Sequence, residues 1–235
     1  MVETQKGDNR KREFLLTALD LFSEKGYEKT TIQDIIDRMG VSKGAFYHYF
    51  NSKEDVLITV ANNYAAEAIR LIKDISTRED LTAVEKINAL IESVNKYKSV
   101  REEERAKIKG VFNREENLKL ERKIFKSLKG KASAYLKEII DTGVKEGAMG
   151  DPVNSEELAS FILYVLHSLN SAMDELNDEL FDEEKPLETR EFNEKLEEKL
   201  IFYEEMLNRI LKIKKGSINL KPPYIKRFQR LKEVK

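Results

Sequence analysis

The sequence predicts an all-α fold of about nine helices, in which a small N-terminal helical domain is joined by one long helix to a larger C-terminal helical domain. Two observations carry this prediction. Only 10 glycines and 4 prolines occur in 235 residues, while 36% of the residues are charged, a balance typical of helix-rich proteins. Apolar residues also recur at three- and four-residue spacing through most of the chain. We place the domain boundaries at residues 1–53, 54–215 and 216–235, the last being a basic tail.

The composition excludes several classes of protein. Without cysteine, the chain has no disulfide framework, zinc–thiolate site or cysteine nucleophile. No run approaches the roughly 20 apolar residues that span a membrane, and the N-terminus lacks the apolar core of a signal peptide, so we expect a cytoplasmic protein without a membrane partner. His48 and His167 are far apart in sequence, and no phosphate-cradling glycine loop or histidine–carboxylate spacing occurs. We therefore expect no enzymatic activity, catalytic residue, cofactor or metal.

The net charge of −1 hides a strong asymmetry along the chain. Residues 1–53 carry a net charge of about +1, residues 54–211 about −10 and residues 212–235 about +8. Gly216 and the two prolines at residues 222–223, which lie within this last segment, should end the folded core. That segment is either an ordinary solvated tail, a fold element, a dimer strap or a contact to a polyanion.

The first helix should follow a disordered arm of eight residues and begin near Asp8 or Asn9, either of which is a good N-cap. Gly26 should end it in the left-handed conformation. Three basic residues in its first turn oppose the helix dipole, which reflects either ordinary surface charge or nearby phosphates. Its buried face is expected to contain Phe14, Leu15, Ala18, Leu19, Leu21 and Phe22.

Residues 30–57 contain three capped helix starts and one sharp turn. Good N-cap residues precede each helix, and two of them have an acidic residue at capping-box spacing. The three N-cap residues are Thr31, Ser42 and Ser52. Asp34 follows Thr31, and Asp55 follows Ser52, at the capping-box spacing. Gly40 breaks the chain between the second helix and the short third one. A helix, a glycine-containing turn and a second short helix are the signature of a helix-turn-helix.

The fourth helix should run unbroken from Lys53 to about Ile75, because no glycine or proline interrupts its apolar spacing. At 1.5 Å per residue this is a rod of about 35 Å. Three further helices are expected at residues 83–97, 102–113 and 116–145, followed by a loop at residues 146–152.

The last two predicted helices carry the widest apolar faces. Asn154 with Glu157 should start the eighth helix, and the ninth, at residues 192–214, should follow a long mobile acidic connection at residues 174–191. The ninth helix alternates its apolar residues by threes and fours, as a coiled-coil seam does. That seam could pack within the subunit, but two such helices favour a four-helix dimer interface. The expected interface residues are Leu166, Leu169, Met173, Leu196, Leu200, Tyr203, Leu207 and Ile210.

The third helix divides into two faces at 100° per residue. Phe46 and Phe50 are one turn apart and should face the core. The residues that then point outward or flank that face are Gly44, Ala45, Tyr47 and His48. Small residues beside an imidazole and a phenol suit entry into a major groove about 12 Å wide. Lys43 lies in the first turn, where phosphate binding is favourable.

Residues 10–57 resemble the N-terminal DNA-binding domain of the TetR family of transcriptional repressors. The matching segments are Ala18–Tyr27, Thr30–Ile32, Gly40–Phe50 and Ser52–Glu54. The resemblance covers about a fifth of the chain, and the later helices match the family's all-α plan without carrying a motif of their own.

The resemblance implies a DNA-binding surface. The implied phosphate contacts are Thr31, Tyr47, Tyr49 and Lys53, the implied base contacts are Gln33, Lys43, Gly44, Ala45 and His48, and Ser42 lies with them at the helix start. Thr31 and Ser42 are helix caps in any case, and Tyr49 could instead belong to the core.

The resemblance also implies a homodimer that binds double-stranded DNA and a small-molecule effector of unknown identity. The candidate effector contacts are Tyr64, Tyr97, Phe112, Phe125, Tyr135, Phe161, Tyr164 and His167, each of which could equally be ordinary core. The implied function is a ligand-responsive repressor on a pseudo-palindromic operator. The alternatives are an activator, a regulator controlled by a protein partner, or a helical ligand-binding module or enzyme with a vestigial head.

Overall fold

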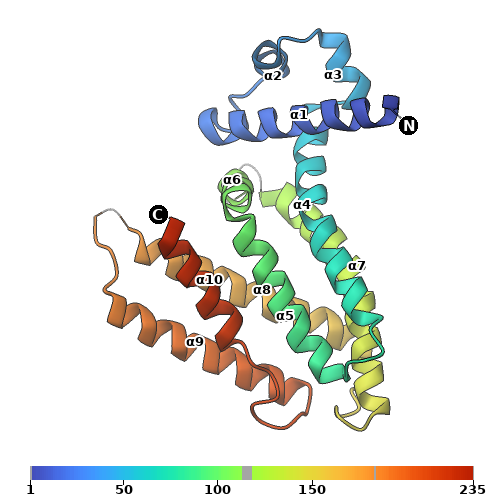
Figure 1. Ribbon diagram of the computed structural model, residues 1–235, viewed down its shortest axis with the longest axis vertical. Coiled ribbons are helices and arrows are strands. Elements are labelled where there is room, and N and C mark those ends of the chain that lie inside the picture. Colours follow the sequence, from blue (N-terminus) through green and yellow to red (C-terminus); the bar gives the residue numbers. More distant parts are fainter. Residues whose placement is uncertain (1, 113–117, 183, 235) are drawn as a thin grey trace. The chain divides into compact units, whose positions relative to one another are not determined.

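The computed structural model describes residues 2–112, 118–182 and 184–234. Within these ranges the chain forms ten α-helices and no strand, so the predicted all-α fold is confirmed (Figure 1). The helices are α1 (Val2–Lys25), α2 (Ile32–Met39), α3 (Lys43–Tyr49), α4 (Lys53–Ser76), α5 (Ala83–Val100), α6 (Glu102–Phe112), α7 (Leu118–Lys145), α8 (Ser155–Leu180), α9 (Thr189–Ile210) and α10 (Lys221–Val234). They form two compact units: the first comprises Met1–Glu67 and Arg101–Leu128, the second Ala68–Val100 and Lys129–Lys235.

The first unit is built around aromatic side chains from α1 and α3. Phe14, Phe22, Phe46 and Phe50 are at most 1% exposed, and each removes a large apolar area from water. The Phe14 ring packs edge-on against Phe46, with 5.8 Å between ring centroids. The same core takes in α2, the start of α4 and Val111 of α6.

Caps predicted from the sequence fix the ends of α2 and α3. The Thr31 hydroxyl accepts the Asp34 amide at 3.1 Å, while the Asp34 carboxylate accepts the Thr31 amide at 2.8 Å, which completes a capping box. Gly40 ends α2 with a φ of 61°, a left-handed conformation that suits glycine. The Ser42 hydroxyl accepts the Ala45 amide at 3.3 Å and starts α3. The direction change between α2 and α3 therefore depends on three local residues.

The second unit has its own apolar core, in which α8 packs against α9 and α10 packs against α5. Leu169 of α8 and Leu200 of α9 are at most 1% exposed. Tyr224 and Phe228 of α10 are 2% and 3% exposed, and the Phe228 ring lies 5.0 Å from that of Phe192. Helix α10 is therefore a structural part of this unit.

The prediction that the core ends at Gly216 is wrong. Ile218 and Leu220 are buried, and the Glu204 carboxylate accepts the amides of Leu220 and Lys221 at 2.7 and 3.3 Å. The segment after Gly216 thus starts a capped helix, whose apolar side chains the second unit covers.

Two other expected boundaries are also wrong. Residues 2–8 belong to α1 instead of forming an arm, because a helix extends readily through residues that contain no proline. Helix α8 continues to Leu180 because Leu176 and Leu180 prolong its buried stripe, so the acidic connection shortens to residues 181–188. None of the described helices meets the length and apolarity that crossing a membrane requires.

Candidate nucleic-acid interface

Helix α3 presents the two faces expected from its sequence. Phe46 and Phe50 are buried in the first unit, whereas Lys43, Gly44 and His48 are exposed. Tyr47 keeps 49% of its surface exposed, and Ala45 is partly exposed beside it. The orientation of the helix is therefore confirmed, and its outer face carries small, phenolic, imidazole and ammonium groups.

Aromatic contacts hold this outer face in place. The Tyr47 ring packs edge-on against Phe46 at 5.5 Å, so the phenol reaches outward from a buried base. The His48 ring lies 4.7 Å from Tyr49, whose own ring packs against Phe14 at 5.8 Å. Tyr49 is only partly exposed, which fits the alternative that it is packing.

The first turn of α2 is held by polar contacts at the protein surface. The Asp34 carboxylate accepts the Thr31 hydroxyl at 2.8 Å and the Lys25 ammonium at 2.7 Å. The Lys25 ammonium and the Thr31 bonds together hold the pKa of Asp34 well below its ordinary value of 3.8. Gln33, in the same turn, is exposed and donates to Asp37, which lies one turn further along α2, at 2.7 Å.

Lys53 differs from the other expected phosphate contacts in the hydrogen bonds that its ammonium group makes. Its ammonium donates to the Tyr27 carbonyl at 2.7 Å and to the Glu28 carbonyl at 3.3 Å. The same atom lies 4.2 Å from the centroid of the Tyr27 ring. The sequence carries no signal for these contacts, because Tyr27 and Lys53 are 26 residues apart.

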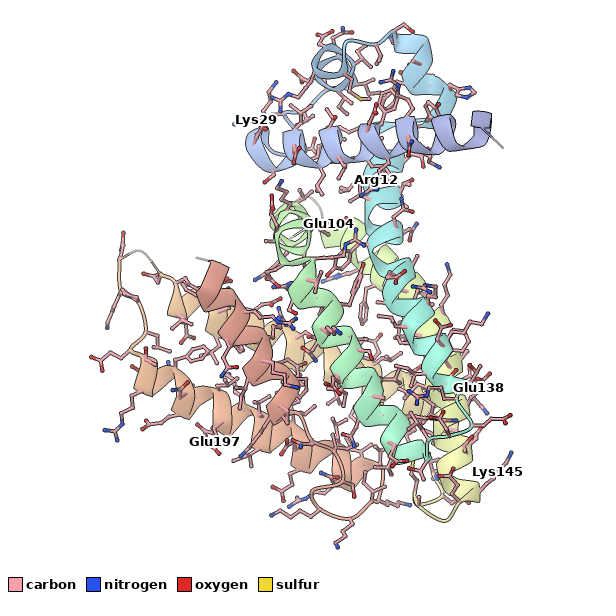
Figure 2. All side chains as sticks on the ribbon, viewed as in Figure 1. Arg12, Lys29, Glu104, Glu138, Lys145 and Glu197 are labelled. Carbon is pink, nitrogen blue, oxygen red and sulfur yellow. The ribbon has the colours of Figure 1, made fainter. Side chains whose placement is uncertain are left out.

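Ion pairs reduce the positive charge that the first unit offers to a polyanion. Arg38 pairs with Glu24 at 2.8 Å, which lowers the pKa of Glu24 and raises that of Arg38. Arg12 on α1 and Lys29 in the turn after it, both labelled in Figure 2, are exposed, as is Lys43. None of these three has an ion-pair partner among the described side chains. Any phosphate binding by this unit therefore depends on few cations and on neutral donors such as Tyr47.

The expected effector contacts come from both units. Tyr64 and Phe125 belong to the first unit, whereas Tyr97 and Tyr135 belong to the second; all four are partly exposed. Phe161 and Tyr164 are 51% and 49% exposed on α8, and His167 is exposed beside them. These three are surface residues, because the stripe of α8 that faces the core lies at Ile162, Leu169 and Met173. The side chain of Phe112 lies outside the described part of the chain.

The expected dimer interface also needs correction. Leu169, Met173, Leu196, Leu200 and Leu207 are at most 5% exposed, because α8 and α9 bury their seam within one subunit. Leu166, Tyr203 and Ile210 keep part of their surface. The spacing of the apolar residues correctly predicted which side chains of α8 and α9 form a seam. It could not predict that the two helices pack against each other within one subunit.

The same two helices also carry large exposed apolar residues, of which Ile201 and Phe202 were not among the expected site residues. Phe161 and Tyr164 of α8 are joined there by Phe202 and Ile201 of α9, which are 58% and 46% exposed. The Ser168 hydroxyl lies 2.9 Å from the Tyr203 phenol and ties the two helices together. Large exposed apolar side chains of this kind are candidates for a contact with another protein.

Comparison with known proteins bears on the first unit most directly. The family described as "Bacterial regulatory proteins, tetR family" matches residues 14–60, the segment that contains α2, α3 and the start of α4. YuxN of Bacillus subtilis, an uncharacterized HTH-type transcriptional regulator, is 41% identical over 85 residues, which are 35% of this chain and 29% of that protein. The transcriptional repressor KstR2 of Rhodococcus jostii is 36% identical over 62 residues, or 26% of this chain and 30% of that protein.

Similarity beyond the first unit is weaker. The fatty acid metabolism regulator protein of Bacillus subtilis is 32% identical over 131 residues, which are 55% of this chain and 66% of that protein. The matched segments therefore span from about a quarter to about two thirds of the first curated relatives. The solved structure of the SmeT–triclosan complex aligns with a TM-score of 0.64 at 18% identity, over 90% of this chain and 95% of that one. This last likeness concerns the fold alone.

Proposed function

Because the chain belongs to the TetR family of transcriptional regulators, we propose that it is a homodimeric repressor whose release from DNA is controlled by a small-molecule effector. The observation that carries the proposal is the outer face of α3, where Lys43, Gly44, Tyr47 and His48 are exposed over buried phenylalanines. A helix with this face enters a major groove with its small residues close to the bases. KstR2, a transcriptional repressor that is 36% identical over 62 residues, supports repression as the outcome of binding.

We assign the proposed dimer contact to exposed apolar residues of α8 and α9 instead of to their buried seam. Phe161, Tyr164, Ile201 and Phe202 together present aromatic and aliphatic groups of the kind enriched at interface cores. Two copies joined there would carry two α3 helices. They would bind half-sites whose centres lie roughly 34–36 Å apart, or at a larger spacing in register with the helical turn.

Control by an effector has a physical route through α6. In the first unit, Lys107 of α6 pairs with Asp20 of α1 at 2.8 Å, and Val111 of α6 is 1% exposed in the core. Helix α5 of the second unit ends at Val100, and α6 begins two residues later at Glu102. We propose that a ligand bound in the second unit acts on α6 through this covalent junction; within the first unit, α1 supports α3 through Phe14. Effector and DNA would then weaken each other's binding equally.

The effector is proposed to carry a fatty acyl chain. The support is the fatty acid metabolism regulator protein, whose similarity extends beyond the family's DNA-binding segment. A cationic ligand, which the acidic body of the chain would favour, is the competing class.

The test is a gel shift and DNase footprint of the purified chain on the DNA that flanks its own gene. We expect a footprint with dyad symmetry, lost when a long-chain acyl-CoA is added and retained when free coenzyme A or a hydrophobic amine is added. A footprint without dyad symmetry would count against the dimer, and release by the amine alone would reassign the effector.

A reporter gene behind the footprinted segment distinguishes a repressor from an activator. Persistent failure to bind DNA would favour the vestigial head.

A further inference from the structure

We infer that Lys53 is a positioning residue that clamps the start of α4 to the turn in front of α2, and that it does not bind phosphate. The inference rests on the proposed DNA-binding surface and concerns how that surface is held. An ammonium group has three donor hydrogens. In Lys53 they meet the Tyr27 carbonyl at 2.7 Å, the Glu28 carbonyl at 3.3 Å and the face of the Tyr27 ring, whose centroid lies 4.2 Å away. Nothing in this arrangement requires a phosphate.

Both ends of the clamp are fixed by the protein. Lys53 is the first residue of α4, whose start is held by Ser52 and Asp55: the Asp55 amide donates to the Ser52 hydroxyl at 3.0 Å, and the Asp55 carboxylate accepts the Asn51 amide at 3.0 Å. At the other end, Tyr27 is 9% exposed and packs edge-on against Phe22 at 5.1 Å. Burial raises the pKa of Tyr27 to about 12, so its phenol is neutral at physiological pH.

The clamped turn determines where α2 begins. Gly26 ends α1 with a φ of 90°, and the buried Thr30 hydroxyl donates to the Gly26 carbonyl at 2.7 Å and the Leu21 carbonyl at 3.2 Å. Thr31, the N-cap of α2, follows directly. The carbonyls that Lys53 binds are therefore three and four residues before that cap. Loosening the clamp would let α2, and α3 behind it, change their orientation on α1.

Phosphate binding by Lys53 would have to break these bonds. Hydrogen bonds that involve a charged group are worth more than neutral ones, and two carbonyls would be left without their donor. Lys43 provides the contrast, because it is exposed on α3 and has no hydrogen-bond or ion-pair partner among the described side chains. The Lys43 ammonium lies over the Tyr47 ring, 6.0 Å from its centroid, and keeps its hydrogens for a phosphate, whereas the Lys53 ammonium already donates to two carbonyls.

The experiment compares the full chain with three variants, Lys53→Met, Lys53→Arg and Lys43→Met. Affinity for the footprinted DNA is measured from about 50 to 200 mM salt, a range over which phosphate contacts dominate the change. Hydrogen exchange of the α2 amides is measured on the same proteins without DNA. The salt dependence reports phosphate neutralisation, while exchange reports the hold on α2, so a purely electrostatic and a positioning role give different patterns.

We expect Lys53→Met to bind about tenfold more weakly at every salt concentration, with an unchanged slope and faster α2 exchange, because it loses charge-assisted hydrogen bonds. Lys53→Arg should restore affinity to within about threefold, since a guanidinium can donate to both carbonyls. Lys43→Met should reduce the slope by about 0.9 per subunit. Failure of Lys53→Met to fold would also support the clamp, because losing a surface phosphate contact does not unfold a protein.

A Lys53→Met protein with a slope reduced by about 0.9 per subunit and unaltered α2 exchange would overturn the inference. If no variant and no parent protein bound DNA, the proposed function would fail. The exchange measurement would still decide the clamp, since it needs no DNA.

Discussion

At the residue scale, the cap of α2 gives the first unit a defined response to acid. The pKa of Asp34 is depressed by Lys25 and Thr31, so its carboxylate stabilises the fold at pH values above its ordinary pKa of 3.8. That contribution is lost as pH falls below 3.8 through the lower folded pKa. We therefore expect the protection of the α2 amides, measured by exchange and corrected for the intrinsic exchange rate at each pH, to fall from pH 6 to pH 3 more in the parent protein than in Asp34→Asn. Asp37→Asn, an exposed carboxylate on the same helix, is the matched control and should behave as the parent does.

Residue roles were predictable where they are local and unpredictable where they are not. Thr31, Gly40 and Ser42 were identified from the chemistry of their own turns, and the two phenylalanines of α3 from a spacing of four. The contact of Lys53 with a carbonyl 26 residues away depends on how α1 and α4 meet, and no local pattern encodes it. For that reason a family-derived assignment to phosphate was reasonable, although the structure points to another role.

At the scale of the helix, α10 shows that a pair of prolines can begin a helix instead of ending the core. The prolines at residues 222 and 223 were interpreted as the end of the core, yet proline is tolerated in a first helical turn, where the amide hydrogens have no intrahelical acceptor. In α10 they fall directly after Lys221, and Glu204 satisfies the free amides before them. Tyr224 and Phe228, four residues apart, carried the helical signal that the basic charge obscured.

The role of α10 in the core can be tested with one pair of substitutions. Phe228→Ala should reduce the free energy of unfolding by about 3 kcal/mol or more, since it empties a buried aromatic site beside Phe192. Ile225→Ala, on the same helix but 41% exposed, should cost less than about 1 kcal/mol. Denaturant unfolding followed by circular dichroism measures both. Equal, small losses in the two variants would mean that α10 adds little to the core.

At the scale of the whole molecule, the proposed repressor would depend on assembly, because one DNA-binding unit is nearly neutral. Residues 1–53 carry a net charge of about +1, while duplex binding relies largely on neutralising phosphates. Periodicity alone predicted a dimer seam on α8 and α9, but a heptad-like stripe cannot distinguish a partner helix in the same subunit from one in another. The exposed residues between the buried ones, Phe161 and Phe202 among them, are the ones to which we assign the proposed dimer contact.

A single charged residue on that surface should therefore dissociate the proposed dimer and, for the same reason, weaken its binding to DNA. We expect Phe202→Glu to halve the mass measured by analytical ultracentrifugation at micromolar concentration, because a carboxylate would be buried without a partner at the interface. Its DNA affinity should fall at least tenfold and its salt slope should decrease by about half, since each subunit supplies half of the phosphate contacts. Val153→Glu, at an apolar residue in the loop before α8 that is even more exposed than Phe202, should change neither quantity. A Phe202→Glu protein that remains dimeric would place the interface elsewhere, whereas one that is monomeric but binds DNA with an unchanged slope would show that one nearly neutral unit suffices.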